Sequence, residues 1–162
     1  MAGKKPLDEK TNVMRLLDAA QLEYMSYCYI DSGAISGIDV ADTIGCDRGM
    51  LFKTLVTVGK SGNHYVFVIP CAEELDLRKA ASCVGEKNIE MVKSKELLAL
   101  TGYIHGGCSP IGMKKQFATV VDETAQLYDK IIFSGGKIGY MVCMAPEDLK
   151  KMVEFKYEDL CV

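Results

Sequence analysis

The stretch Met50-Leu51-Phe52-Lys53-Thr54-Leu55-Val56-Thr57-Val58 predicts a buried β-strand, because apolar and β-branched residues follow one another almost without a break. Arg48-Gly49 precedes this run and Gly59 follows it. Lys53 is the exception, since burying an ammonium group without a partner is costly. Two interpretations are open. Lys53 lies on the outward face with its aliphatic stem along the surface, or it points into a pocket that holds an anionic or carbonyl ligand.

The neighbouring sequence predicts an antiparallel partner for this strand. Residues 60–63, Lys-Ser-Gly-Asn, have turn composition and hairpin length, and they lead into the apolar run 64–69. Gly135-Gly136 likewise predicts a two-residue hairpin turn between the expected strands 130–134 and 138–143.

Helical periodicity and capping residues predict the remaining elements. Thr11 is expected to cap the first helix and Ser94 the fourth, and Pro146 suits the first position of the last. The expected helices span 11–22, 39–44, 75–84, 94–100 and 146–153. The expected strands span 24–30, 50–58, 64–69, 88–92, 117–121, 130–134 and 138–143. Because hairpins and helices alternate without a βαβ repeat, we expect an α+β fold with a curved, mixed, mostly antiparallel sheet surrounded by helices.

Length and composition indicate one ordinary globular domain spanning 1–162, with residues 1–10 as a loose lead. The net charge of −3 gives no general basic field for nucleic acid, although local contacts with RNA remain open because charge placement also matters. No apolar stretch approaches the roughly 20 residues that span a bilayer, and none follows the polar N-terminus as in a signal peptide. We therefore expect a protein that is neither secreted nor membrane-embedded.

The cysteines are widely spaced and form neither a Cys-x-x-Cys motif nor a pair at zinc-ligand spacing with a histidine. They are Cys28, Cys46, Cys71, Cys83, Cys108, Cys143 and Cys161. Such thiols are typical of a reducing compartment, so we expect a cytoplasmic protein with no metal or other cofactor.

A glycine-rich loop over residues 102–112 is the best candidate for ligand binding outside the central strand. Five of its eleven residues are glycine or proline, and such loops let backbone amides approach a ligand closely. His105 lies in this loop, and a role in the site is conceivable, whereas His64 opens a strand and is expected to be structural. No nucleophile elbow, Walker lysine loop or His-Glu-x-x-His motif occurs in the sequence.

Three motifs occur together and carry a resemblance. They are Phe52-Lys53-Thr54-Leu55, then Thr101-Gly102-Tyr103 with Gly106-Gly107 and Ser109-Pro110-Ile111-Gly112, then Phe133-Ser134-Gly135-Gly136-Lys137. In this order and spacing they resemble the YbaK family of free-standing Cys-tRNA(Pro) deacylases, which are related to the editing insertion domain of bacterial prolyl-tRNA synthetase. The resemblance covers nearly the whole chain, from about Thr11 to Leu160.

The resemblance implies trans-editing of tRNA(Pro) that prolyl-tRNA synthetase has mischarged with cysteine, an amino acid its pocket rejects poorly. In this family the substrate's own thiol is thought to attack its ester carbonyl and release a cyclic thiolactone. A protein nucleophile is then unnecessary, and the enzyme contributes positioning, desolvation and oxyanion stabilisation. The implied partners are the aminoacyl-adenosine end of tRNA and prolyl-tRNA synthetase.

The resemblance also implies site residues. Lys53 falls on the family's essential lysine, and Gly106 on a loop glycine whose backbone meets the terminal ribose or the ester. The implied substrate-binding residues are Tyr29, Thr54, Gly107, Ser109, Ser134 and Gly135. Thr54 faces away from Lys53 on a regular strand, so we expect it to act through its backbone or its packing. Ser36 stands where some relatives have an aromatic residue, which leaves amino-acid selectivity open.

Alternative functions stay open at this stage. One is a deacylase for Ala-tRNA(Pro) or another mischarged tRNA, which would need attack by water because alanine has no thiol. Another is a non-catalytic module that binds aminoacyl-adenosine or a synthetase. Lys114 and Lys115, beside the glycine-rich loop, are the expected local phosphate contacts. Oligomeric state cannot be predicted from the sequence.

Overall fold

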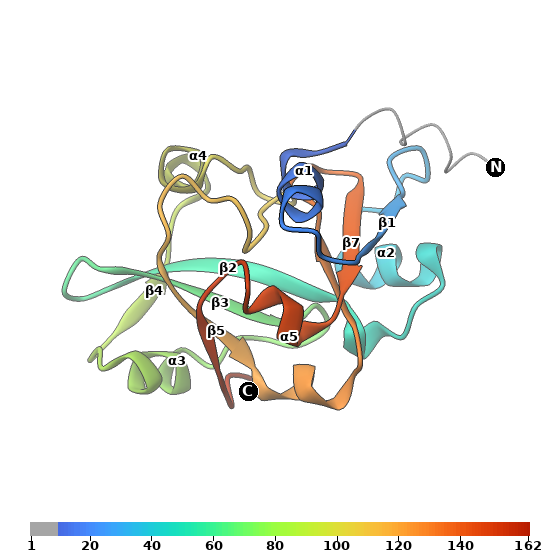
Figure 1. Ribbon diagram of the computed structural model, residues 1–162. Helices are drawn as coiled ribbons and strands as arrows, with labels where there is room; N and C mark the ends of the chain where they lie inside the picture. The colour runs from blue at the N-terminus through green and yellow to red at the C-terminus, as the bar shows by residue number, and fades with distance from the viewer. Residues whose placement is uncertain (1–9) are drawn as a thin grey trace.

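A computed structural model describes residues 10–162, in which the strands form two sheets (Figure 1). The larger sheet has the strand order β4-β2-β3-β5-β8 and the smaller has the order β1-β7-β6. The strands are β1 Met25–Cys28, β2 Phe52–Gly59, β3 His64–Pro70, β4 Ile89–Met91, β5 Ala118–Asp122, β6 Ile131–Ser134, β7 Tyr140–Met144 and β8 Phe155–Glu158. Of the lead expected at residues 1–10, all but Lys10 lies outside the described residues.

The α+β fold and the mostly antiparallel pairing are confirmed. The central hairpin joins β2 to β3 through residues 60–63, with Lys53 opposite Ile69. Among the strand ladders of the described part of the chain, β3 with β5 and β5 with β8 are parallel. The expected single sheet is instead divided, and an isolated parallel bridge between Leu51 and Ile132 joins its two parts.

Helices pack on both sides of the larger sheet and beside the smaller one (Figure 1). They are α1 Asn12–Ala19, α2 Gly37–Ile44, α3 Leu77–Val84, α4 Ser94–Thr101 and α5 Pro146–Leu149, with 3₁₀ turns η2 Arg48–Met50 and η3 Glu123–Leu127. In the view of Figure 1, α4 lies above the larger sheet and α3 lies below it. Apolar clusters fill three spaces: one beneath α1 and α4, one beside α2 and one between α3 and the larger sheet.

Three local predictions were wrong. The N-cap of α4 is Lys93, which makes no side-chain capping bond, and Ser94 is the first helical residue. Five residues, 135–139, connect β6 to β7 instead of a two-residue turn, because Ser134 pairs with Met141. The last helix ends at Leu149, and the unpredicted strand β8 follows it.

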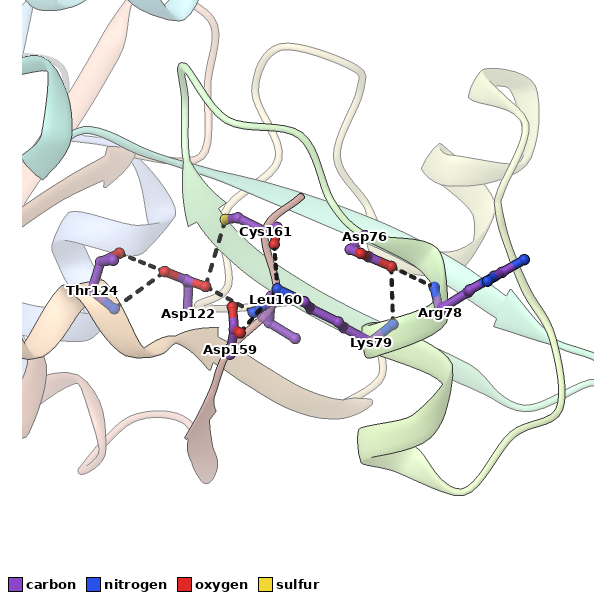
Figure 2. Close-up of polar contacts among 8 residues, drawn as sticks. All are labelled: Asp76, Arg78, Lys79, Asp122, Thr124, Asp159, Leu160 and Cys161. Carbon is purple, nitrogen blue, oxygen red and sulfur yellow. Dashed lines mark hydrogen bonds and ion pairs between the residues drawn. The ribbon is translucent and has the colours of Figure 1, made fainter.

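The C-terminal segment is held to the larger sheet by Asp122, whose carboxylate is almost fully buried at the end of β5 (Figure 2). It accepts hydrogen bonds from the backbone N–H of Leu160 at 2.9 Å and from the hydroxyl of Thr124 at 2.6 Å. The N–H of Thr124 and the thiol of Cys161 also donate to it. Every contact comes from a donor, so both carboxylate oxygens act as acceptors.

Candidate active site

A cavity of about 390 Å³ lies at the junction of the two sheets. Its walls come from β2, the start of α2, the start of α4, the glycine-rich loop 102–112 and the end of β6. Val40 and Met141 line it on the side of the smaller sheet, and Val56 and Leu97 line it on the side of α4. This size and this mostly apolar lining are typical of a small-ligand pocket.

The cavity occupies a gap along one edge of β2. On this edge β4 pairs with Thr57–Gly59, and the bridge to β6 is made by Leu51, so no strand covers the segment between them within the described chain. At the β4 end of the gap, the N–H of Val92 donates to the carbonyl of Val56 at 3.1 Å.

The hydrogen-bonding pattern between β2 and β3 determines which backbone groups of β2 face this gap. The N–H of Cys71 donates to Leu51 O, and the N–H of Gly59 donates to Asn63 O, each at 2.8 Å. Because backbone direction alternates along an antiparallel strand, odd-numbered residues of β2 bond to β3. The N–H and C=O of Thr54 therefore face the uncovered edge, where a ligand can reach them.

Lys53 lies on the cavity wall and is half-buried. Of the two interpretations left open by the sequence, an outward surface position or a pocket, the structure supports the pocket. Within the described residues its ammonium has no hydrogen-bond or ion-pair partner. Its charge acts on the thiol of the neighbouring Cys71. Burial raises the pKa of that thiol, and the Lys53 ammonium opposes the rise. An unpartnered cation in a partly apolar pocket is suited to an anionic or carbonyl ligand.

Thr54 presents its hydroxyl to the cavity, in addition to the backbone or packing role expected of it. It is on the opposite face of β2 from Lys53, yet it also lines the cavity, because the cavity wraps around the open edge of the strand. Its Oγ1 is buried and has no hydrogen-bond partner among the described residues. Buried hydroxyls without partners are rare and costly, so this one is available to a ligand.

The glycine-rich loop reaches the cavity through Gly106, whose φ of +91° is a conformation that favours glycine. A Cβ at Gly106 would meet the side chain of Ile138 at ordinary contact distance, so the loop rests on the β6–β7 connection. Gly107, the next residue, is buried against the backbone of Lys137 and Ile138 and does not line the cavity.

Tyr29 and Ser134 line the cavity from the smaller sheet. The N–H of Tyr29 donates to Gly139 O at 2.8 Å, and Ser134 Oγ accepts from the N–H of Gly136 at 3.1 Å. Ser109 and Gly135 do not line it. Ser109 Oγ accepts from the N–H of Ile111, and the N–H of Gly135 donates to Tyr140 O, so both hold the loops that shape the wall.

One wall is formed where α2 begins against the end of β3, and of its residues only Ser36 had been singled out from the sequence. A Cβ on Gly37 would come within 2.5 Å of the Cβ of Cys71, so this approach requires glycine. Ser36 caps α2 by accepting from the N–H of Asp39, and it lines the cavity together with Gly37 and Cys71. A close contact between positions 37 and 71 leaves no signal in a single sequence.

Two residues of the glycine-rich loop also line the cavity. His105 is exposed there, which brings this histidine to the site, whereas His64 lies in β3 against Phe117. Cys108 is buried, and burial raises the pKa of its thiol to about 12. A nucleophilic cysteine needs its thiolate, so Cys108 is unsuited to attack.

Residues 10–162 contain neither a metal-ligand cluster nor a membrane-spanning helix. No group of histidine, cysteine and carboxylate side chains in this range is arranged to hold a metal ion. No helix in it has the length and apolar character required to cross a bilayer.

The sequence profile of the aminoacyl-tRNA editing domain matches residues 34–152, the segment that supplies most of the cavity wall. The chain belongs to the aminoacyl-tRNA editing family. Editing domains of this family remove an amino acid from a tRNA. The resemblance to the YbaK family is confirmed, and so is the general activity of an aminoacyl-tRNA deacylase.

Two curated relatives and one solved structure show what the chain is most usefully compared with. The editing protein is 44% identical, over 98% of its chain and 97% of the relative, to EbsC of Enterococcus faecalis, which is designated a candidate Cys-tRNA(Pro)/Cys-tRNA(Cys) deacylase. It is 31% identical over 63% of its chain to a proline–tRNA ligase of Pelobacter propionicus, where the match covers 17% of the ligase. The fold also matches a crystal structure described as a candidate trans-editing enzyme for prolyl-tRNA synthetase, with a TM-score of 0.79, 24% identity, and coverage of 93% and 96% of the two chains.

Proposed function

We propose that this editing protein clears cysteine from mischarged Cys-tRNA(Pro), by a reaction in which the substrate's own thiol breaks the aminoacyl ester. The observation that carries the proposal is the pairing, in one cavity, of an unpartnered Lys53 ammonium with an unpartnered Thr54 hydroxyl, beside thiols that are poor nucleophiles. Such a cavity supplies binding and polarity and leaves the nucleophile to the substrate.

The proposed reaction is an intramolecular acyl transfer. The cysteinyl thiol loses its proton to solvent, and its sulfur forms a bond to the ester carbonyl carbon. The bond between that carbon and the ribose oxygen breaks, and the oxygen takes up a proton. The products are tRNA with a free terminal hydroxyl and the cyclic thiolactone of cysteine, so this step consumes no water and is of the lyase type.

The cavity residues have separate proposed roles. Lys53 holds the aminoacyl-adenosine end, and the hydroxyl of Thr54 donates to the oxygen that becomes negative as sulfur attacks. The backbone of Gly106 meets the terminal ribose or the ester, while Tyr29 and Ser134 complete the wall around the amino acid. Gly107, Ser109 and Gly135 act indirectly, by holding the loops that carry these groups.

The designation of the Enterococcus relative supports cysteine as the amino acid, and the similarity to a proline–tRNA ligase supports prolyl-tRNA synthetase as the source of the mischarged tRNA. We place this reaction in the cytoplasm, where the synthetase works and where free thiols stay reduced.

The test is deacylation of tRNA(Pro) charged with cysteine, serine, alanine or proline, with Cys-tRNA(Cys) alongside. Serine is the sharpest comparison, because it replaces the thiol with a much weaker nucleophile of similar shape. Turnover of the cysteinyl esters alone supports the thiol mechanism. Comparable turnover of seryl or alanyl esters would show attack by water, and no turnover of any ester would leave a binding module.

A further inference from the structure

The two sides of the cavity mouth carry opposite charge. We define the α2 flank as residues 30–50 and the α4 flank as residues 92–117; both supply side chains to the cavity wall. The α2 flank has four aspartates and one arginine, a net charge of −3. The α4 flank has four lysines and one glutamate, a net charge of +3. A chain that is acidic overall therefore presents one basic surface beside its site.

The lysines of the α4 flank are exposed and free to bind. They are Lys93, Lys95, Lys114 and Lys115, and none has an ion-pair partner within residues 10–162. On the α2 flank, by contrast, Arg48 is engaged by Asp42 at 2.7 Å. Of the two flanks, only the α4 flank thus carries positive charge that is free of an ion pair.

The four lysines stand at the two ends of α4. Lys93 is its N-cap, and Lys95 is in its first turn. At the other end the N–H of Lys114 donates to Thr101 O at 3.0 Å, and the stem of Lys114 packs over Gly102. Eight helical residues span about 12 Å, so the two ends of α4 can contact separate phosphates of one nucleic-acid strand.

We propose that the substrate's RNA strand leaves the cavity over the α4 flank, with its phosphates on Lys93, Lys95, Lys114 and Lys115. The inference rests on the proposed function, since it assumes that the RNA ends in the cavity. The acidic α2 flank repels phosphates and so fixes the direction of exit. Lys53 holds the terminal nucleotide inside, and the α4 flank supplies the contacts outside.

The test compares two matched double variants. Lys114→Gln/Lys115→Gln removes two charges from the α4 flank while keeping the side-chain stems. The control, Lys60→Gln/Lys87→Gln, removes two exposed charges at the tip of the β2–β3 hairpin and just before β4. Binding of uncharged tRNA(Pro) is measured by fluorescence anisotropy from 50 to 200 mM salt. Turnover is measured with Cys-tRNA(Pro) and with the 3′-cysteinyl ester of adenosine, which has no phosphate.

In the α4 variant we expect tRNA affinity at 50 mM salt to fall about tenfold, and the slope of log affinity against log salt to become shallower by up to about 2. kcat/KM should fall similarly for Cys-tRNA(Pro) and stay unchanged for the adenosine ester. The control variant should match the wild type in each measurement.

The inference fails if both double variants lose affinity equally, or if the α4 variant binds tRNA as the wild type does. In the latter case a variant that has lost binding to prolyl-tRNA synthetase would assign the lysines to a protein partner instead. Salt-dependent tRNA binding that needs Lys114 and Lys115, without turnover of any ester, would support the RNA path while refuting the proposed function.

Discussion

Asp122 and Thr54 both bury a polar group in the larger sheet, but their surroundings differ completely. Four donors converge on the Asp122 carboxylate at the end of β5 (Figure 2). Thr54 Oγ1, in β2, has no partner in the described part of the protein, and neither has the ammonium of its neighbour Lys53.

The difference indicates that Asp122 stabilises the fold, whereas the hydroxyl of Thr54 is available to a ligand. A buried polar group whose bonds are all made within the protein fixes the chain, and removing it destabilises the fold. A buried polar group left without a partner lowers the stability of the free protein. That loss is recovered only when a ligand supplies the missing hydrogen bond. Substitution of Asp122 should therefore change mainly the free energy of unfolding, whereas substitution of Lys53 or Thr54 should change mainly kcat/KM.

The largest expected effect is on activity, from Lys53→Ala. We expect kcat/KM for deacylation to fall by about 100-fold or more, since a preorganised charge at the reacting group typically contributes that much. The free energy of unfolding should stay within about 1 kcal/mol of the wild type, because no internal partner is lost. Lys60→Ala, in the exposed hairpin turn, serves as the control; wild-type turnover by Lys53→Ala would remove Lys53 from the site.

Asp122→Asn should do the reverse. An amide NH₂ would face donors that now meet a carboxylate, so we expect the free energy of unfolding to fall by about 2–4 kcal/mol in urea denaturation. At a temperature where the variant is folded, its kcat/KM should be unchanged. Asp159→Asn, which loses only the exposed ion pair with Lys79, should cost less than about 1 kcal/mol. Equal losses in the two variants would contradict the role given to Asp122.

Thr54→Val tests the unpartnered hydroxyl directly, because it keeps the side-chain shape. We expect the free energy of unfolding to rise by about 1 kcal/mol and kcat/KM to fall about tenfold. The matched control is Thr57→Val on the same strand, where the hydroxyl donates to Tyr65 O at 3.0 Å. That variant should lose about 1 kcal/mol of stability. A stability loss at both positions would mean that Thr54 has a partner after all.

The smallest expected effect is on activity in Cys108→Ala, which should keep kcat/KM within about threefold of the wild type. Its stability should respond to pH. Burial raises the pKa of Cys108 from 9.0 to about 12, so the folded state holds this proton after the unfolded state has lost it. Stability is therefore unaffected below pH 9 and falls between pH 9 and 12, by about 1.4 kcal/mol per pH unit for this group. Urea denaturation across this range should show a shallower fall in Cys108→Ala.

Much of the site followed from local sequence. Lys53 was visible because a single charge interrupts an apolar run, and the loop 102–112 because glycines crowd a connection longer than a turn needs. The family resemblance then singled out Gly106 within that loop. The hairpin at residues 60–63 was predictable from its turn composition, and its length matches the structure. These signals involve neighbouring residues, which is why one sequence can carry them.

What the sequence missed depends on contacts between distant segments. Thr54 could be placed on its strand, but its open edge exists only because β4 and β6 pair with different ends of β2. The contact of Gly37 with Cys71 is equally non-local. β8 was missed because Phe155–Glu158 is short and half charged, and its strand form comes from pairing with β5.

The place of the cavity at the junction of the two sheets sets when the site can exist during synthesis of the chain. Met25 of β1 pairs with Cys143 of β7, so β1 cannot pair until the chain has been synthesised beyond residue 143. A growing chain that has reached Asp122 already contains Lys53, Thr54 and the glycine-rich loop, but it lacks Ser134 and Met141 on the opposite wall. The ribosome must therefore extend the chain beyond Met141 before the cavity has all of its walls.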